Sequence, residues 1–489
     1  MRVASRRTRR ARDEDGHGRP RLVAVARAGR RRRGRRAPRS RRRGPCATRR
    51  RAAKPDGPRG GRWLTSAEFA ARYGAPASAV RRVSRWLRSS GCAVQRFPGR
   101  QFVRCRHHAP GPLPGALRPL IDGIVDPSLL TVVWRSPLGR PASVASNGAF
   151  YFSPTEFART YGLDRGAAAG LDGRGVMIGL LAASQMATED LEAFRTRFGL
   201  PPADFVQSSG PRTGNVVEAE AVLDATWAGA VAPAARLFLA VSQSIGEAYD
   251  LLIASNTPDV ISSSLDICPP TRRVRGSANR LLARAFRQAA VQGQTVLVAS
   301  GDTGSHVCPD GGFGLLASSP LVTAVGGTSP MPVLDADGMA TAYGSESVWN
   351  DGTVSSGGGR TAVRRPSYQR GGAKRTIPDV AFPASGVYPI IVRGQRLLAG
   401  GTSAAAPAWA GVVARLVQQE GRRVGFLNSR LYEIGRAQRH GGAAVFHDVV
   451  VGDNGTSLAH GYPAKPGYDL ATGWGSVDGA ALLDVFPRP

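Results

Sequence analysis

A serine at the start of a predicted helix is the first residue with the setting for chemistry. Ser403 follows the pair Gly400-Gly401 and opens an Ala-rich stretch over 404–416. Paired glycines allow a sharp turn and a close approach, and Pro407 places the helix start near Ser403. Backbone N–H groups at a helix start favour negative charge. Ser403 is therefore either the N-cap of a buried helix or a nucleophile, and a nucleophile needs a base.

Two carboxylates are the best candidates for that base. Glu220 and Asp224 stand four residues apart on a predicted helix over 216–230, which puts them on one face. The rest of this helix is apolar and leaves no broad polar side. Glu218 lies six residues from Asp224 and falls on another face. The pair is either two solvated surface carboxylates or a base with the group that orients it.

A third carboxylate, Asp302, ends the apolar run 296–299 in the sequence Gly301-Asp302-Thr303-Gly304. Aspartate in such a setting is either a plain turn residue or part of a site. Histidine is the usual base for serine, but none of the seven histidines has a convincing position. A subtilisin-type Ser-His-Asp hydrolase stays open as an alternative.

The elements that must position these residues alternate between strands and helices. We predict strands over 176–181, 236–241, 260–265, 295–300 and 321–325, and a strand pair over 388–392 and 396–399. We predict helices over 189–198, 216–230, 245–254 and 278–292. This order indicates an α/β domain over 151–489, with a parallel sheet flanked by helices. Ser403 and Asp302 both follow strand ends, where sites form in such sheets.

Two different segments precede this domain. Residues 1–62 are rich in arginine and carry about two-thirds of the net charge of +31, so we expect a disordered head. A catalytically inactive protein that binds through this head is a second alternative, although the head has no aromatic residues for stacking on bases. Residues 63–150 read as a small α/β unit, with a capping box at Thr65 and Glu68 and a hairpin over 94–105, followed by a linker.

The five cysteines show no metal-ligand spacing. Cys268 with Cys308, and Cys92 with Cys105, are candidate disulfides in an oxidising compartment. No apolar run approaches the roughly 18 residues of a membrane span. The run 22–26 is too short for the apolar part of a signal peptide.

Four motifs, taken together and in this order, resemble the sedolisin family of serine-carboxyl peptidases. The motifs are Gly401-Thr402-Ser403-Ala404 with Pro407, Glu220 with Asp224 ahead of Ala228-Gly229-Ala230, Gly301-Asp302-Thr303-Gly304, and Phe446-His447-Asp448-Val449. The stretch 63–74 is similar to that family's activation prodomain, as in pro-kumamolisin. The resemblance runs from about residue 63 to the end and implies a subtilisin-like sheet preceded by a prodomain.

The resemblance implies a role for each candidate. Ser403 would attack a peptide carbonyl, Glu220 would accept its proton, and Asp224 would orient Glu220. Asp302 would hydrogen-bond the oxyanion, which a carboxyl group does only while protonated. An ionised Glu220 beside a neutral Asp302 implies activity at acidic pH.

The resemblance also implies a calcium site, secretion and self-processing. The ligands would be Asp448 and Asp469, with carbonyl oxygens of Val449, Lys465 and Gly467, an all-oxygen set that suits a hard cation. It implies a secreted, monomeric, self-processed endopeptidase whose partners are peptide or protein substrates and its own prodomain. The chain departs from the family in Ala183-Ser184, where many relatives carry a glutamate, and in the unmatched first half of the prodomain.

Overall fold

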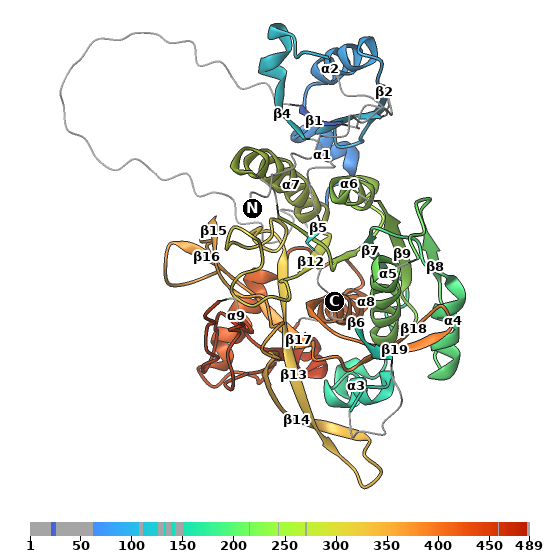
Figure 1. Cartoon of the computed structure of the whole chain (residues 1–489), viewed down its shortest axis with the longest axis vertical. Coiled ribbons are helices and arrows are strands. Elements are labelled where there is room, and N and C mark those ends of the chain that lie inside the picture. Colours follow the sequence, from blue (N-terminus) through green and yellow to red (C-terminus); the bar gives the residue numbers. More distant parts are fainter. Residues whose placement is uncertain are drawn as a thin grey trace, which may run out of the picture.

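The computed structural model describes residues 21–25, 62–106, 111–125, 132–133, 138–141, 150–214, 216–242, 244–268, 271–457 and 459–486. Its centre is an eight-stranded sheet in the order β14-β13-β12-β10-β7-β9-β8, with β17 beside β13 (Figure 1). Only the β13–β14 pairing in this sheet is antiparallel. The strands are β7 (Met177–Ala182), β8 (Phe205–Gln207), β9 (Arg236–Val241), β10 (Val260–Ser263), β12 (Thr295–Ala299), β13 (Thr323–Leu334), β14 (Ala340–Val348) and β17 (Val380–Pro383).

Helices cover both faces of the sheet, which confirms the predicted α/β class. Alternate residues of a strand point to opposite faces. Leu297 of β12 therefore packs with α5 and α8 in one core, whereas Val296 and Val298 pack with α6 and α7 in a second core. The helices are α3 (Pro154–Thr160), α4 (Thr188–Arg197), α5 (Val216–Val231), α6 (Ile245–Ser255), α7 (Arg272–Gln292), α8 (Thr402–Glu420), α9 (Asn428–Gln438) and α10 (Gly479–Asp484).

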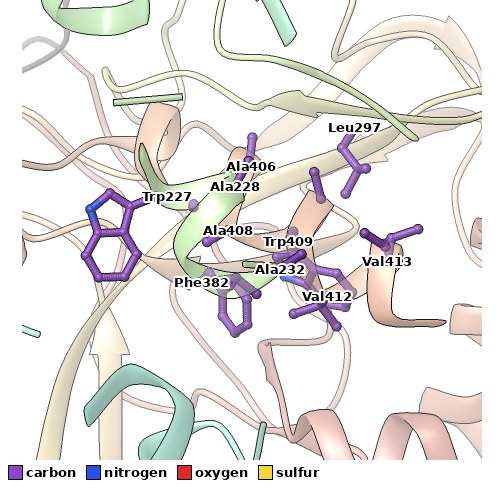
Figure 2. Packing of buried hydrophobic residues seen from close by; sticks show 14 of the residues in the cluster. Trp227, Ala228, Ala232, Leu297, Phe382, Ala406, Ala408, Trp409, Val412 and Val413 are labelled. Atoms are coloured by element: carbon purple, nitrogen blue, oxygen red, sulfur yellow. The ribbon is translucent and has the colours of Figure 1, made fainter. Parts of the chain in front are cut away.

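The first core joins α5 to α8, the two helices that carry the candidate residues. Trp227 of α5 and Trp409 of α8 are fully buried, with Phe382 of β17 beside them (Figure 2). The helices approach closely at Gly411, where an added Cβ would lie 2.5 Å from the Cβ of Val231. The guanidinium of Arg415 donates to the carbonyl of Val231 at 2.7 Å. The separation of the two helices is thus fixed by direct packing.

All seven predicted strands and all four predicted helices of the large domain are present. The β13–β14 pair is far longer than the predicted strand over 321–325, because both strands continue past the sheet edge as an antiparallel ribbon. Smaller pairings surround the sheet. They are β11 (Asp266–Ile267) with β5 (Val132–Val133), β15 (Gly359–Arg364) with β16 (Lys374–Ile377), β18 (Tyr388–Val392) with β19 (Gln395–Ala399) and β6 (Leu138–Pro141), and β20 (Phe446–His447) with β21 (Ser476–Val477).

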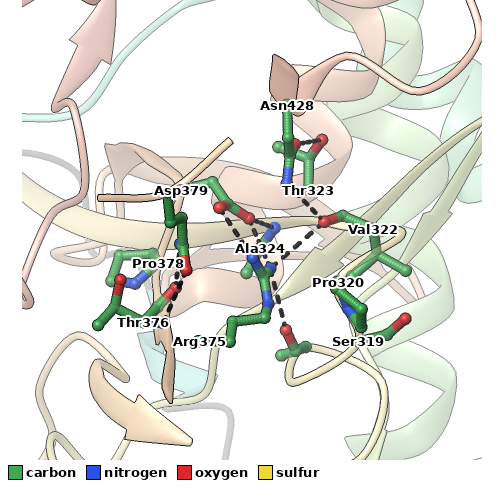
Figure 3. A network of polar contacts seen from close by, with 12 residues as sticks. Ser319, Pro320, Val322, Thr323, Ala324, Arg375, Thr376, Pro378, Asp379 and Asn428 are labelled. Atoms are coloured by element: carbon green, nitrogen blue, oxygen red, sulfur yellow. Dashed lines mark hydrogen bonds and ion pairs between the residues drawn. The ribbon is translucent and has the colours of Figure 1, made fainter. Parts of the chain in front are cut away.

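A buried ion pair fixes the chain where β16 leads into β17. Arg375 and Asp379 are both fully buried, and the guanidinium contacts a carboxylate oxygen at 2.7 Å (Figure 3). The same carboxylate accepts from the backbone N–H of Ala324 in β13 at 2.8 Å. Since both charges have hydrogen-bond partners, their burial is tolerated.

The N-terminal domain, meaning β1 and residues 62–125, is a four-stranded antiparallel sheet with helices. Its strands follow the order β2-β3-β1-β4. Its elements are β1 (Arg21–Val25), α1 (Ser66–Arg72), α2 (Ala77–Ser89), β2 (Ala93–Arg96), β3 (Phe102–Arg106) and β4 (Ile121–Val125). The predicted capping box at Thr65 and Glu68 and the predicted hairpin are confirmed.

The expectation of a wholly disordered head is wrong for residues 21–25. They form β1, which pairs with β3 and with β4 in the middle of the N-terminal sheet. The apolar run that is too short for a signal peptide is long enough for a strand. The predicted linker also contains structure, because β4, β5 and β6 lie in it. The rest of the head lies outside the described residues.

The N-terminal domain docks on α6 and α7 of the large domain (Figure 1). The Gln101 side chain donates to that of Gln288 on α7 at 2.7 Å, and both are buried. The indole N–H of Trp63 donates to the carbonyl of Arg423 at 3.0 Å. Arg104 forms an ion pair with Glu247 on α6. The contact is thus polar and specific.

Both candidate disulfides are present. Cys92 pairs with Cys105 inside the N-terminal domain, with Cα atoms 5.0 Å apart. Cys268 pairs with Cys308 at a Cα separation of 5.5 Å and ties β11 to the loop that follows β12. Each pair closes a loop in the unfolded chain and so stabilises its domain.

Candidate active site

Ser403 lies in the first turn of α8, as the glycine pair predicts. Gly401 precedes the helix with φ of +84°, a conformation that glycine adopts without strain. A Cβ at Gly401 would lie 2.6 Å from a carboxylate oxygen of Asp302. The turn therefore needs glycine both for its backbone shape and for the space that Asp302 occupies. Ser403 itself is only 5% exposed.

Asp302 is held against the turn that leads to Ser403. Its Oδ1 accepts the backbone N–H of Thr402 at 2.8 Å and the Thr402 hydroxyl at 2.7 Å. Burial raises the pKa of Asp302 to about 6, although the two bonds from Thr402 oppose that rise. A neutral carboxyl at mildly acidic pH is what an oxyanion donor requires.

Asp224 is linked to Ser403 through a third residue, Ser264. The Ser264 hydroxyl lies 2.5 Å from Oδ1 of Asp224 and 3.0 Å from the carbonyl oxygen of Ser403. A hydroxyl has one hydrogen and cannot donate to both acceptors at once. Both contacts are satisfied when Asp224 is protonated and donates to Ser264, which then donates to Ser403.

The electrostatics agree with a protonated Asp224. Burial, followed by the negative charge of Glu220, raises the pKa of Asp224 well above its ordinary value. Glu220 lies one turn earlier on α5 and is also buried. Two close buried carboxyls favour a state with a single negative charge.

Glu218 belongs to a different cluster, as its spacing on the helix predicts. Its buried carboxylate accepts from Arg212 at 2.6 Å and from Arg393 at 3.2 Å. These ion pairs hold the start of α5 against the β18–β19 turn.

The described histidines are placed elsewhere. His447 lies in β20 and stacks on Tyr343 with ring centroids 3.6 Å apart. Burial lowers its pKa to about 4. The carbonyl oxygen of His306 accepts from Thr303, and that of His460 accepts from Ser305. None of the described histidines forms a hydrogen bond with Ser403, whose carbonyl oxygen accepts from the Ser264 hydroxyl.

The proposed calcium ligands converge on one loop. Oδ2 of Asp448 accepts the N–H of Gly467 at 2.7 Å, and Oδ2 of Asp469 accepts the N–H of Lys465 at 3.2 Å. Val449 is buried beside them. Burial raises the pKa of Asp448, and it raises that of Asp469 to about 6. The buried carboxylate of Asp469 and the exposed carboxylate of Asp448, beside a loop of backbone carbonyls, suit a hard cation. No group of three or more His, Cys, Asp and Glu side chains converges within the described ranges.

Two residues of the site were not found from the sequence. Ser264 ends the run Ser262-Ser263-Ser264 and follows β10 directly. Sites form beyond strand ends in such sheets, so this position is the feature of the sequence that could have indicated Ser264. The sequence indicates Thr402 only as a member of the motif around Ser403, whereas the structure gives it two hydrogen bonds to Asp302. None of the helices in the described part of the chain is both long and apolar enough to cross a membrane.

The chain is similar to known proteins over most of its length. The family model described as "Pro-kumamolisin, activation domain" matches residues 49–110. Kumamolisin of Bacillus sp. (strain MN-32) is 33% identical over 368 residues, which are 68% of this chain and 63% of that protein. Sedolisin of Pseudomonas sp. (strain 101) is 36% identical over 257 residues, which are 48% of this chain and 42% of that protein. The chain thus spans less than two-thirds of either relative.

A solved structure of Pseudomonas sedolisin, complexed with two molecules of pseudo-iodotyrostatin, matches 69% of this chain and 98% of its own length. The sequences are 29% identical and the TM-score is 0.61. The match to an activation domain at residues 49–110 also extends that domain upstream of the predicted start at residue 63. Together with the subtilisin-like sheet, these matches show that the chain belongs to the sedolisin family of serine-carboxyl peptidases and carries an activation prodomain.

Proposed function

We propose that this protein is a serine-carboxyl endopeptidase that works at acidic pH and is made as a self-processed precursor. The observation that carries the proposal is the chain of contacts from Asp224 through Ser264 to Ser403, with Asp302 at the preceding turn. Ser264, Asp302 and Ser403 come from three separate strand or helix ends, and Asp224 comes from the middle of α5. Stability alone does not require carboxyl groups buried around one serine, because their burial costs free energy.

Each group has a role that its surroundings support. Ser403 attacks the carbonyl carbon of the scissile peptide bond, and Glu220 accepts the hydroxyl proton. Asp224 stays neutral, holds Ser264, and leaves the single negative charge of the pair on Glu220. Asp302 donates its proton to the developing oxyanion. The leaving amine takes the proton from Glu220, and water then hydrolyses the acyl-enzyme by the same steps.

The electrostatics predict an acidic working range. Asp302 is neutral below about pH 6, where its carboxyl donates, and it ionises above that value. Glu220 must be ionised, which sets the acidic limit of activity. The active window therefore lies between the ionisation of the base and that of Asp302.

Endopeptidase action is supported by the strand pairings next to the site. β11, which begins two residues after Ser264, pairs with β5, and β19, which ends two residues before Gly401, pairs with β18 and β6. Strands next to the site that pair with extended segments of this chain suit an extended peptide substrate.

Calcium and secretion belong to the same proposal. Asp448 and Asp469, with carbonyl oxygens of Val449, Lys465 and Gly467, would hold Ca²⁺ and tie the C-terminal loops to the domain. The two disulfides support folding in an oxidising compartment, as for a secreted protein.

The test is a pH profile for hydrolysis of an unfolded protein. We compare wild type with Ser403→Ala and Glu220→Gln, and use Glu433→Gln on the exposed side of α9 as the matched control. We expect both site variants to lose activity by about 10³-fold or more at acidic pH, with the control unchanged. Full activity in Glu220→Gln would favour the histidine-dependent alternative. Activity in Ser403→Ala would contradict the proposal altogether.

The inactive binding protein remains the second alternative. It predicts salt-dependent binding to DNA that survives Ser403→Ala and disappears when residues 1–62 are removed. Because residues 21–25 form a strand of the prodomain, this deletion also perturbs the fold. Replacing only the arginines at 30–33 and 41–43 is therefore the cleaner experiment.

A further inference from the structure

The large domain holds the side chain of Trp63, from the N-terminal domain, in a narrow slot. The indole ring lies against Gly293, directly after α7, and against Gly425, in the loop between α8 and α9. A Cβ at Gly293 would lie 2.4 Å from the ring, and a Cβ at Gly425 would lie 2.6 Å from it. Both glycines have positive φ, +79° and +70°. The two glycines therefore give the slot its width, because any other residue would be strained and would overlap the indole.

Hydrogen bonds within the large domain fix the walls of the slot. The N–H of Gly425 donates to the carbonyl of Gly293 at 3.0 Å, and the hydroxyl of Thr295 in β12 donates to the carbonyl of Gly425 at 2.6 Å. The guanidinium of Arg423 donates to a carboxylate oxygen of Asp259 at 2.7 Å. All of these partners belong to the large domain, so these bonds do not need the indole to be in place.

The slot also has a hydrogen-bond acceptor for the polar end of the ring. The indole N–H of Trp63 donates to the backbone carbonyl of Arg423 at 3.0 Å. The next residue adds a backbone contact, since the N–H of Leu64 donates to the carbonyl of Val291 at 3.0 Å. A phenylalanine ring has no donor for the Arg423 carbonyl. The ligand that fits is therefore a tryptophan side chain followed by a free backbone N–H.

This slot and the catalytic residues lie at opposite edges of the central sheet. Gly293 stands two residues before β12, whereas Asp302 follows the other end of that strand. The five residues of β12 span about 17 Å. A ligand in the slot therefore does not occupy the space beside Ser403.

We propose that the slot is a second binding site of the large domain, separate from the active site, for a tryptophan side chain. Trp63 occupies it in this structure and holds the start of α1 against α7 (Figure 1). In any form of the protein whose Trp63 has left, the slot binds a tryptophan of another polypeptide. Neither Ser403 nor any other candidate catalytic residue takes part in this binding.

The experiment empties the slot in the full-length chain and uses indole as the probe. Trp63→Ala removes the ring, while other contacts of the N-terminal domain, such as that of Gln101 with Gln288, remain. The background is Ser403→Ala, which avoids self-digestion. We expect indole to bind Trp63→Ala with a Kd of about 1 mM or lower and to raise its Tm, because a fixed apolar cavity binds a small molecule of matching shape. The parent chain should show neither effect, and nor should Tyr73→Ala, which removes an exposed aromatic ring from the same domain.

Two further measurements test which atoms bind and where. Indene has the shape of indole but no N–H group, so it should bind Trp63→Ala about tenfold more weakly, because the Arg423 carbonyl is then left without a donor. Equal affinity for the two molecules would overturn the specificity for tryptophan. With Ser403 intact, indole should leave kcat/KM of Trp63→Ala for an unfolded protein unchanged. Competitive inhibition by indole would place its site beside Ser403 and overturn the proposal. If no chain hydrolyses the unfolded protein, the proposed function fails and the binding result stands.

A second variant keeps the test decisive if Trp63→Ala does not fold. Trp63→Phe retains a ring but loses the donor to Arg423, so the Leu64 N–H should exchange with solvent about tenfold faster than in the parent chain. The Gly425 N–H should exchange at its parent rate, since it belongs to the walls of the slot, and Tyr73→Phe should change neither rate. A folded Trp63→Ala that does not bind indole, or unchanged exchange at Leu64 in Trp63→Phe, would overturn the proposal.

Discussion

Thr402 donates two hydrogen bonds to a single carboxylate oxygen of Asp302, from its backbone N–H at 2.8 Å and from its hydroxyl at 2.7 Å. The hydroxyl of Thr402 also accepts from the N–H of Gly301 at 3.1 Å. The bonds hold one oxygen of Asp302 at the helix start, one residue before Ser403. They leave the second oxygen to carry the proton that the mechanism needs.

The alkaline limb of the activity profile should follow from Asp302. Its pKa of about 6 lies above the ordinary value, so the neutral form is stabilised in the fold and is lost as pH rises through about 6. Asp302→Asn cannot ionise, so we expect relative activity near neutral pH to rise. The measurement is the ratio of kcat/KM at about pH 7 to that at about pH 5. Asp337→Asn, in an exposed turn, is the control, and an unchanged ratio in Asp302→Asn would contradict this role.

Ser264→Ala should lower kcat without unfolding the protein. The variant breaks the link between Asp224 and the Ser403 carbonyl, and we expect kcat to fall about tenfold with little change in KM. Its neighbour Ser263 is the matched control, because its buried hydroxyl donates to the carbonyl of Leu265. Ser264→Ala loses two buried hydrogen bonds and the Ser263→Ala control loses the bond to Leu265, each bond being worth about 1 kcal/mol. Equal losses of kcat in both variants would reduce Ser264 to a structural residue.

Gly411→Ala should disturb stability and activity together. The added Cβ would lie 2.5 Å from that of Val231, so α5 and α8 must separate. We expect a loss of about 1–3 kcal/mol in unfolding free energy, with lower kcat because α5 carries Glu220 and α8 carries Ser403. Gly276→Ala on α7 meets only the end of a flexible side chain and should stabilise by up to about 1 kcal/mol. Chemical denaturation and initial rates check both variants. Unchanged activity in a destabilised Gly411→Ala would contradict the expectation that the packing of α5 against α8 positions Glu220 and Ser403.

Calcium binding should raise the melting temperature of the protein without acting directly on the catalytic residues. At a concentration about 100-fold above Kd, a cation that binds only the folded state adds about 2.7 kcal/mol. We expect a chelator to lower Tm, and Asp448→Asn to abolish the calcium-dependent shift. Asp453→Asn, in the neighbouring loop, should keep it. The shift is read by thermal unfolding of inactive Ser403→Ala, which avoids self-digestion. An equal shift in Asp448→Asn would place the site elsewhere.

Patterns within short stretches were predictable from the sequence. The capping box at Thr65, the helix 216–230 and the strand before Asp302 were all predicted, because each depends on local spacing and burial. The ribbon β13–β14 was predicted only in part, since its outer half is exposed and lacks a steady apolar alternation. The strand β1 was not predicted, because it lies in a segment whose high charge indicates disorder. It forms because β3 and β4 pair with it on both sides.

The sequence by itself determined the types of the reacting groups and their order, namely a serine after paired glycines, two carboxylates on one helical face, and an aspartate at a strand end. Only the tertiary structure decided that Ser264 joins Asp224 to Ser403, and that β5 pairs with β11 and β6 with β19. These contacts connect residues 40 and 139 positions apart in the chain or depend on backbone pairing with distant strands. Local periodicity carries no information about such pairings, because the packing of α5 against α8 and the sheet register create them.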